Sequence, residues 1–307
     1  MKFRAHDTFF IRKGWLHKGM KNVVNDPNVF MGVNGNPMDI LGIGANMVKA
    51  LRYWLQAVGL TVEPNSGRRT QSLTPFGKVV YESDKYIEEI GTLWLLHYKL
   101  VRDKTKEEND NGEATAWYYF FNEFNFSEFS GGNSRKEHQN DFVERLIKYI
   151  QMNGEEVSKR SLDDDFNCII NTYVPRIKSN PQKVQPESNI DCPLGELGLI
   201  DIISKKDRLY KKCTPKKDTL HPLILLAVIL DNAVEQTEIK ITSIQNDKNN
   251  AGKVFNLDII TLVNLLNKLE LMGYIKVIRT AGLDVIRIDK SMNFLECVRE
   301  YYKVINE

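Results

Sequence analysis

Two carboxylates that lie close together in the sequence, Asp191 and Glu196, could do chemistry as a pair. They flank the turn-prone segment CPLG (192–195), which can bring both side chains near one point. Two or three carboxylates around a divalent metal such as Mg²⁺ are a common way to activate water for hydrolysis. We therefore predict Asp191 and Glu196 as metal ligands and as catalytic residues.

Other acidic side chains could complete such a site. Glu123 and Glu128 lie in an aromatic segment, where a buried carboxylate costs free energy unless it is paired, and Asp165 lies in an acidic triplet. The alternative for each of these residues is a salt bridge or a helix cap. We take Glu123 as the third catalytic carboxylate. No standard nuclease pattern, such as a strand-borne acid followed by D/E-x-K, stands out.

His6 and Asp7 open the string HDTFFIRKGWLHKG, which mixes aromatic rings with cations. His6 is a candidate general base beside Asp7, and the alternative is that the two residues lock the N-terminal turn. Read as a helix that begins near Thr8, the string places apolar residues on one face. Arg12 and Lys18 then lie on other faces, where they can contact phosphates.

Residues 41–60 predict a turn followed by a helix, because one side of the helix is consistently apolar. A hairpin follows, and Thr74-Pro75 begins another helix with a good cap and proline at its first position. Helix, turn, helix and a hairpin with arginines at its tip is the order of a winged helix. The predicted DNA-contacting residues are Arg12, Lys18, Asn46, Lys49, Arg52, Tyr53, Arg68 and Arg69.

The charge distribution supports a polyanion-binding surface at one end of the chain. Residues 1–72 carry ten Lys or Arg and four Asp or Glu, whereas residues 73–174 carry twelve and nineteen. A basic N-terminal third on a chain of net charge +2 is the pattern of a polyanion footprint. Merely uneven surface charge is the alternative.

A second helix–helix–hairpin order is expected at the C-terminus. It comprises an apolar helix (221–233), a second helix (256–272) and two alternating strands around Ala281-Gly282. The fold class is therefore mostly α with small β-hairpins (α+β), built from tandem winged-helix or helix-turn-helix domains. The expected domains are an N-terminal winged helix (1–102), a central helical domain (114–174) and a C-terminal winged-helix-like domain (190–307).

Several classes of protein are excluded or disfavoured. No run of about eighteen apolar residues predicts a membrane span, and the N-terminal residues do not form a signal peptide, so we expect a cytoplasmic protein. The four cysteines are scattered without a CxxC pair, which predicts reduced thiols rather than disulfides or a zinc ribbon.

The order of several segments resembles one bacterial family, the domain-of-unknown-function 4007 family. The resemblance runs from His6 to about Asp289. Asp7 stands where the family usually has Glu, so the carboxylate is kept, and Phe10 stands where the family has a smaller residue or Pro. The segments that carry the resemblance are HDTFFIRKGWLHKG, LGIGANMVKALRYW, LTPFG, TLWLLHY, WYYFFNEF, DDDFNCIINTYVP, DCPLGELGLI and GKVFNLD.

The resemblance implies a component of a DNA phosphorothioation system, in which sulfur replaces a non-bridging backbone oxygen and which serves antiphage defence. It implies nicking of one strand of double-stranded DNA, alongside a cysteine desulfurase and an ATP-dependent sulfur-transfer protein. Cys192 could accept sulfur, but nothing nearby in the sequence lowers its pKa.

Two functions therefore compete. The first is a DNA nicking endonuclease, a phosphodiesterase that uses the carboxylates above. The second is a non-catalytic winged-helix scaffold that recognises DNA, or a transcriptional regulator of the same system, since the winged helix binds DNA without chemistry.

Overall fold

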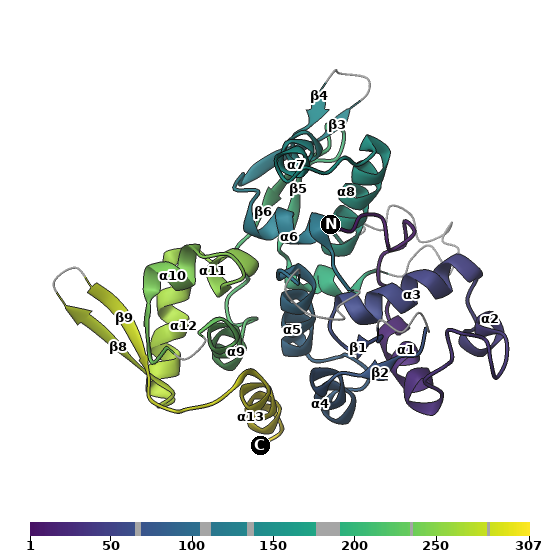
Figure 1. Cartoon of the computed structure of the whole chain (residues 1–307). Coiled ribbons are helices and arrows are strands. Elements are labelled where there is room, and N and C mark those ends of the chain that lie inside the picture. Colours follow the sequence, from purple (N-terminus) through teal and green to yellow (C-terminus); the bar gives the residue numbers. More distant parts are fainter. Residues whose placement is uncertain (65–68, 105–111, 134–137, 176–190, 234–235, 281–282) are drawn as a thin grey trace, which may run out of the picture.

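The structure, a computed structural model, describes seven stretches of the chain. Figure 1 shows helices gathered around a central one; two small sheets lie at the periphery, and a short two-stranded sheet lies among the N-terminal helices. Among the described residues, helices outnumber strands and every strand pair is antiparallel, which confirms the predicted α+β class. The described residues are 1–64, 69–104, 112–133, 138–175, 191–233, 236–280 and 283–307.

The N-terminal elements follow the predicted order of helix, turn, helix and short hairpin. Thr74 accepts a hydrogen bond from the backbone of Gly77 at 2.8 Å, and Pro75 occupies the first turn of its helix, as predicted. The first helix begins at Trp15, because Thr8 and Gly14 adopt left-handed backbone angles that interrupt an earlier start. The elements are α1 (Trp15–Asn25), α2 (Pro37–Leu41), α3 (Ala45–Ala57), β1 (Thr61–Val62), β2 (Ser72–Leu73) and α4 (Pro75–Ser83).

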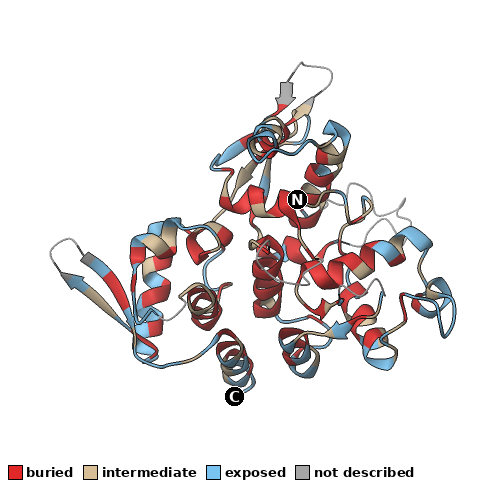
Figure 2. Ribbon diagram, in the orientation of Figure 1, coloured by how far each residue is buried: buried red, intermediate tan, exposed pale blue. Residues whose placement is uncertain are grey.

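Helix α5 (Ile90–Val101) forms the centre of the molecule and is buried along nearly its whole length, as Figure 2 shows. A helix that is hydrophobic on all sides belongs in a core. Its one histidine, His97, contacts the Tyr173 hydroxyl through Nδ1 at 2.7 Å and the Val254 carbonyl through Nε2 at 2.6 Å. Because a carbonyl can only accept, Nε2 donates and Nδ1 accepts. Burial lowers the pKa of His97 to about 4.

The middle of the chain packs three helices against a four-stranded sheet of order β4-β3-β6-β5. Phe129 pairs with Tyr210 in this sheet, so residues 128–140 and 200–212 share it. The strands on the two sides of the expected domain boundary, between residues 174 and 190, therefore belong to one sheet. The elements are α6 (Thr115–Asn122), β3 (Glu128–Asn133), β4 (His138–Asn140), α7 (Asp141–Met152), α8 (Lys159–Tyr173), β5 (Ile200–Ser204) and β6 (Leu209–Lys212).

The C-terminal elements include both predicted helices and both predicted strands. The strands pair in the order β7-β9-β8, and the turn at Ala281-Gly282 lies outside the described residues. The elements are α9 (Pro222–Asn232), β7 (Glu238–Lys240), α10 (Ile241–Asn246), α11 (Ala251–Val254), α12 (Ile259–Leu271), β8 (Ile275–Thr280), β9 (Leu283–Ile288) and α13 (Phe294–Asn306).

Helix α13 crosses back to the N-terminal part of the molecule. The Phe294 ring lies 5.9 Å from the Phe76 ring on α4, and the Tyr302 hydroxyl contacts the Thr92 hydroxyl at 2.6 Å. Gly91 is required at this contact, because a Cβ atom there would lie 2.2 Å from the Tyr301 ring. The last helix therefore completes the packing around α4 and α5.

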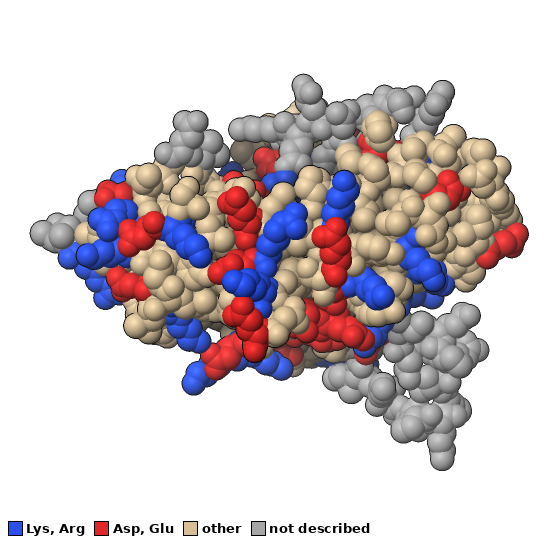
Figure 3. Space-filling model, turned by 90° about the horizontal axis from the view of Figure 1, so that it is seen from below, with Lys and Arg blue, Asp and Glu red and all other residues tan. Residues whose placement is uncertain are grey.

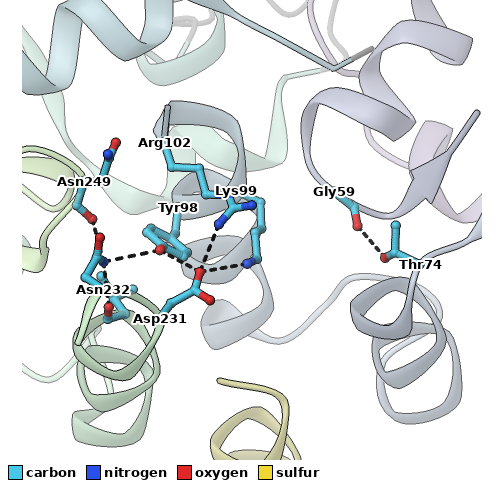
Figure 4. A network of polar contacts seen from close by, with 9 residues as sticks. Gly59, Thr74, Tyr98, Lys99, Arg102, Asp231, Asn232 and Asn249 are labelled. Atoms are coloured by element: carbon cyan, nitrogen blue, oxygen red, sulfur yellow. Dashed lines mark hydrogen bonds and ion pairs between the residues drawn. The ribbon is translucent and has the colours of Figure 1, made fainter. Parts of the chain in front are cut away.

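A cluster of charged and hydroxyl groups joins α5 to α9, as Figure 4 shows. Asp231 on α9 accepts hydrogen bonds from Tyr98 at 2.7 Å, Lys99 at 3.0 Å and Arg102 at 3.1 Å. Burial alone raises the pKa of Asp231, but the charges of Lys99 and Arg102 outweigh it, so the pKa lies below its usual value. A second contact, from Asn232 to the Asn249 carbonyl at 3.1 Å, lies beside it.

Two further predictions can be compared with the structure: that the cysteines are reduced, and that no segment spans a membrane. All four cysteines are free, as predicted, and three of them are buried. Within the described residues, no helix combines the length and the apolar character that crossing a bilayer requires.

Candidate functional site

Asp191 and Glu196 line the same hollow at the molecular surface, with a volume of about 460 Å³. Both side chains are exposed, and Lys13, from the cation-rich N-terminal string, lines the hollow with them. The structure therefore brings together the two predicted ligands and adds a cation from a segment almost 180 positions earlier in the chain. The other lining residues are Pro175, Cys192, Pro193 and Gly195.

A short 3₁₀ helix, η3 (Pro193–Leu197), positions the two carboxylates. Its buried side chains, Leu194 and Leu197, anchor it against α5 and α8. Proline starts the turn and Gly198, with a φ of 64°, ends it in the left-handed conformation that suits glycine. The apolar side of the turn faces the core, so Asp191 and Glu196 remain exposed beside Lys13.

The donor set of this hollow suits a magnesium ion. Among the residues that the structure describes, no group of three or more His, Cys, Asp or Glu could hold a metal by itself. Mg²⁺ commonly takes one or two protein carboxylates and fills its remaining positions with water and substrate phosphate oxygens. Asp191 and Glu196 match that requirement, whereas a structural zinc site would need more ligands.

Cys192 lies at the hollow but is a poor nucleophile. Its side chain is buried, and this burial raises the pKa of the thiol to about 12, despite hydrogen bonds from the backbone of Leu194 and Gly195. A thiol must lose its proton to attack or to accept sulfur. Cys192 therefore stays protonated at neutral pH and contributes packing.

His6 lies in the interior and pairs with Asp165 rather than with Asp7. Its Nε2 donates to Asp165 Oδ1 at 2.7 Å, and both side chains are about 1% exposed. The ring stacks on Trp54 with centroids 5.8 Å apart and meets Trp117 edge-on at 5.4 Å. A general base must reach its substrate, so this burial favours the structural role for His6.

Asp165 holds the N-terminal segment against α8. Besides His6, it accepts the backbone N–H of Arg4 at 2.9 Å, and neighbouring Asp164 forms an ion pair with the Arg4 side chain at 2.9 Å. Burial raises the pKa of Asp165, and the His6 contact opposes that rise. Asp7 is only partly buried and has a left-handed φ of 48°, in a turn closed by its N–H on the Arg4 carbonyl.

Glu123 does not line the hollow with Asp191 and Glu196. It forms an ion pair with Lys248 at 2.5 Å and accepts a hydrogen bond from the Tyr118 hydroxyl at 3.3 Å. This is the salt-bridge alternative for Glu123. Glu128 is exposed on β3, opposite Lys211 in the sheet register.

Four cations gather at a second hollow of about 340 Å³ beside α3. Lys49 and Arg69 are exposed there, as expected for contacts with DNA, and Lys2 joins them from the start of the chain. Arg52 lines the same hollow but forms a two-point ion pair with Glu63, whose side chain is only 7% exposed. Part of the positive charge is therefore neutralised within the fold.

Tyr53, predicted to contact DNA, lies in the interior, and its hydroxyl donates to the Glu113 carbonyl at 3.1 Å. Tyr53 lines the cationic hollow beside Arg52, but most of its side chain is buried. Asn46 is exposed on the first turn of α3 and accepts a long contact from Lys49 at 3.5 Å. Arg68 lies outside the described residues.

The two remaining predicted phosphate contacts also have partners within the protein. Lys18 donates to the Leu41 carbonyl at 2.9 Å, which ties α1 to α2. Arg12 lies over the rings of Phe9 and Trp15, at 5.9 and 5.3 Å from their centroids. Lys13 and Lys2 were not among the predicted phosphate contacts, although both lie in the basic N-terminal third of the chain.

Fold and site together define an α+β protein of mainly helical structure, with a pair of exposed carboxylates beside a lysine. The chain belongs to the family described as "Protein of unknown function (DUF4007)", whose model matches residues 3–302. This confirms the family expected from the sequence segments.

Solved structures with the same fold include "Magnesium ion-bound SspB crystal structure", with a TM-score of 0.81, and "SspB crystal structure", with a TM-score of 0.80. Each is 24% identical to this chain, and each match covers 100% of this chain and 89% of the other. The search of curated proteins found no match. At this identity the solved structures establish the fold.

Proposed function

We propose that the protein is the DNA-binding component of a bacterial DNA phosphorothioation system and that it nicks one strand of double-stranded DNA. The observation that carries the proposal is the hollow in which Asp191 and Glu196 lie beside Lys13. The family resemblance supplies the phosphorothioation context and the expected partners, a cysteine desulfurase and an ATP-dependent sulfur-transfer protein. The magnesium-bound SspB structure, with a TM-score of 0.81, supports the choice of metal.

In this proposal the two carboxylates bind the metal and the lysine stabilises the transition state. Asp191 and Glu196 would hold a magnesium ion, which supplies charge stabilisation and a more acidic water when bound. Hydrolysis adds water across one P–O bond: the hydroxyl goes to phosphorus and the proton goes to the leaving oxygen. The Lys13 ammonium offsets the negative charge that builds up on the phosphate oxygens.

The cationic hollow beside α3 supplies the attraction for the DNA backbone. Lys49 and Arg69 are exposed there, and Asn46 lies one turn earlier on α3. On the face seen from below in Figure 3, by contrast, basic and acidic side chains alternate. Phosphate contacts of this kind position a protein on DNA and make its binding depend on salt.

A plasmid assay tests the nicking activity. Supercoiled DNA is incubated with the protein and Mg²⁺, with and without the presumed sulfur-transfer partners, and the open-circular product is measured. Several kcal/mol of lost charge stabilisation correspond to a rate loss of about 100-fold or more for Asp191→Asn with Glu196→Gln. Asp247→Asn, an exposed carboxylate outside the hollow, is the matched control.

The outcomes separate the two functions. Nicking at the wild-type rate by the double variant would show that this hollow is not the catalytic site. If the wild-type protein binds duplex DNA but never nicks it, even with its partners, the non-catalytic scaffold is the correct function. The order of α2, α3, β1 and β2 favours that second candidate, because helix, turn, helix and hairpin is the order of a winged helix.

A further inference from the structure

A separate polar hollow of about 330 Å³ lies where the middle of the chain meets the C-terminal elements. One side is formed by the segment after α6 and the end of β6, and the other by α10 and α11. Its described lining contains two lysines, Lys212 and Lys253, and neither aspartate nor glutamate. Hydroxyl and amide side chains complete the polar lining, namely Asn125, Ser127, Thr214, Gln245, Asn246 and Asn256.

Both lysines are held in place by neutral oxygen atoms. Lys212 Nζ donates to the carbonyls of Phe120 and Phe124, each at 2.5 Å, at the C-terminal end of α6. Lys253 Nζ donates to Asn125 Oδ1 at 2.6 Å across the hollow's two sides. An ammonium has three N–H groups, so these contacts leave donors on both lysines for a ligand.

The charge of this lysine pair is not balanced within the lining. Lys248 and Lys268, by comparison, form ion pairs with Glu123 at 2.5 Å and with Asp218 at 2.7 Å. Burial and, next, the charge of Lys253 lower the pKa of Lys212 to about 7. Two cations that face one hollow without a carboxylate destabilise each other, and a bound anion would relieve that repulsion.

We infer that the hollow between Lys212 and Lys253 binds a phosphate group, with Ser127, Thr214 and Asn246 as neutral hydrogen-bond donors. A phosphate fits better than a carboxylate, because three or four oxygens can use two cations and several neutral donors at once. The site is separate from the hollow of Asp191 and Glu196, with which it shares no lining residue. A ligand here would contact the middle and the C-terminal parts together.

Calorimetric titration of the full chain with inorganic phosphate tests the site. Anion binding favours the charged form of Lys212, so at pH 8 the protein should take up protons as phosphate binds. The measured heat should then differ between two buffers of different ionisation enthalpy. At pH 6 Lys212 is already charged in the free protein, so the protein should take up no proton; the bound dihydrogen phosphate should instead release protons, and the buffer dependence should change sign.

Substitutions locate the binding. Lys253→Gln removes one partly exposed cation and should weaken phosphate binding about tenfold or more, as expected for a charge-assisted hydrogen bond. Lys240→Gln, an exposed lysine outside the hollow, should bind phosphate as the wild type does. Lys212→Met should also abolish the proton uptake. Since Lys212 contacts the end of α6, Lys253→Gln carries the test if Lys212→Met does not fold.

Two further probes identify the source of the phosphate. Tighter binding of adenosine 5′-monophosphate than of inorganic phosphate, with no binding of adenosine, supports a nucleotide, and equal binding of both anions supports free phosphate. Equal binding of adenosine and its monophosphate would overturn the inference. So would the absence of phosphate binding to the wild type, or unchanged binding by Lys253→Gln.

Discussion

Asp165 and the pair Asp191–Glu196 are carboxylates in neighbouring parts of the fold, but they are held in opposite ways. Asp165 is buried on α8, and its Oδ1 accepts hydrogen bonds from His6 and from the backbone of Arg4. Asp191 precedes the η3 turn and Glu196 lies within it; this turn packs on the same helix, and both residues line a hollow.

This difference in burial suggests a structural role for Asp165 and a ligand-binding role for Asp191 and Glu196. A buried carboxylate whose partners are all protein groups fixes the chain, because any loss of a partner leaves an unpaired charge in the interior. Exposed carboxylates that share a hollow with a lysine are available to a ligand. His6 of the N-terminal string is therefore part of the buried packing, whereas Lys13 of the same string lines the hollow of the proposed site.

Removal of the buried partner should have the largest effect on stability. We expect His6→Ala to lower the free energy of unfolding by about 3–5 kcal/mol, since it leaves Asp165 buried without its main partner. Urea unfolding followed by circular dichroism measures this loss. Lys13→Ala, an exposed change in the same string, should stay within about 0.5 kcal/mol. A loss below about 1 kcal/mol for His6→Ala would contradict the structural role.

The pH dependence of stability should reveal a second buried histidine. His97 has a pKa of about 4 when folded and about 6.5 when unfolded, so between these values the unfolded chain binds more protons. Stability therefore falls as the pH drops, by about 2 kcal/mol from pH 7 to pH 5.

Urea unfolding at the two pH values measures this change. Burial also lowers the pKa of His221, so the difference between wild type and His97→Gln isolates the part that belongs to His97. An identical pH dependence in both proteins would show that His97 is accessible to protons in the folded state.

Substitution of Asp191 or Glu196 should change the stability of the protein much less than substitution of Asp165. We expect Asp191→Asn and Glu196→Gln each to change the free energy of unfolding by less than about 0.5 kcal/mol, as is usual for surface substitutions. Asp165→Asn, measured beside them, should cost several times more. Comparable costs for all three variants would remove the distinction between the two sets of carboxylates.

A modest effect, on DNA binding rather than on stability, is expected at the cationic hollow. Lys49→Ala should weaken duplex binding by no more than about tenfold and lower the slope of log affinity against log salt by about one. Fluorescence anisotropy with a labelled duplex at several salt concentrations measures both quantities. An unchanged slope would place the DNA elsewhere on the protein.

Much of the fold followed from local sequence patterns. Thr74-Pro75 marked the start of α4, and the alternating segments on either side of Ala281-Gly282 form β8 and β9. The pairing of β3 with β6 could not be foreseen, because it joins segments about 80 positions apart whose contact depends on tertiary packing.

The candidate site was only partly predictable for a related reason. Proximity across a four-residue turn indicated Asp191 and Glu196, and they do share a hollow. No local pattern could show that Glu123 pairs with Lys248 or that Tyr53 faces Glu113, since these partners lie far away in the chain. Helical periodicity predicts the direction of a side chain around the helix axis, but it does not predict which other segments pack against that side chain.

The return of α13 to the N-terminal part has a consequence for biosynthesis. Thr92 meets Tyr302 across a separation of 210 residues, and Phe76 meets Phe294 in the same contact. During translation the apolar surface of α4 and α5 therefore emerges from the ribosome long before the helix that covers it. Until then this surface is open to chaperones, and the nascent chain can complete this part of its core only after α13 has emerged.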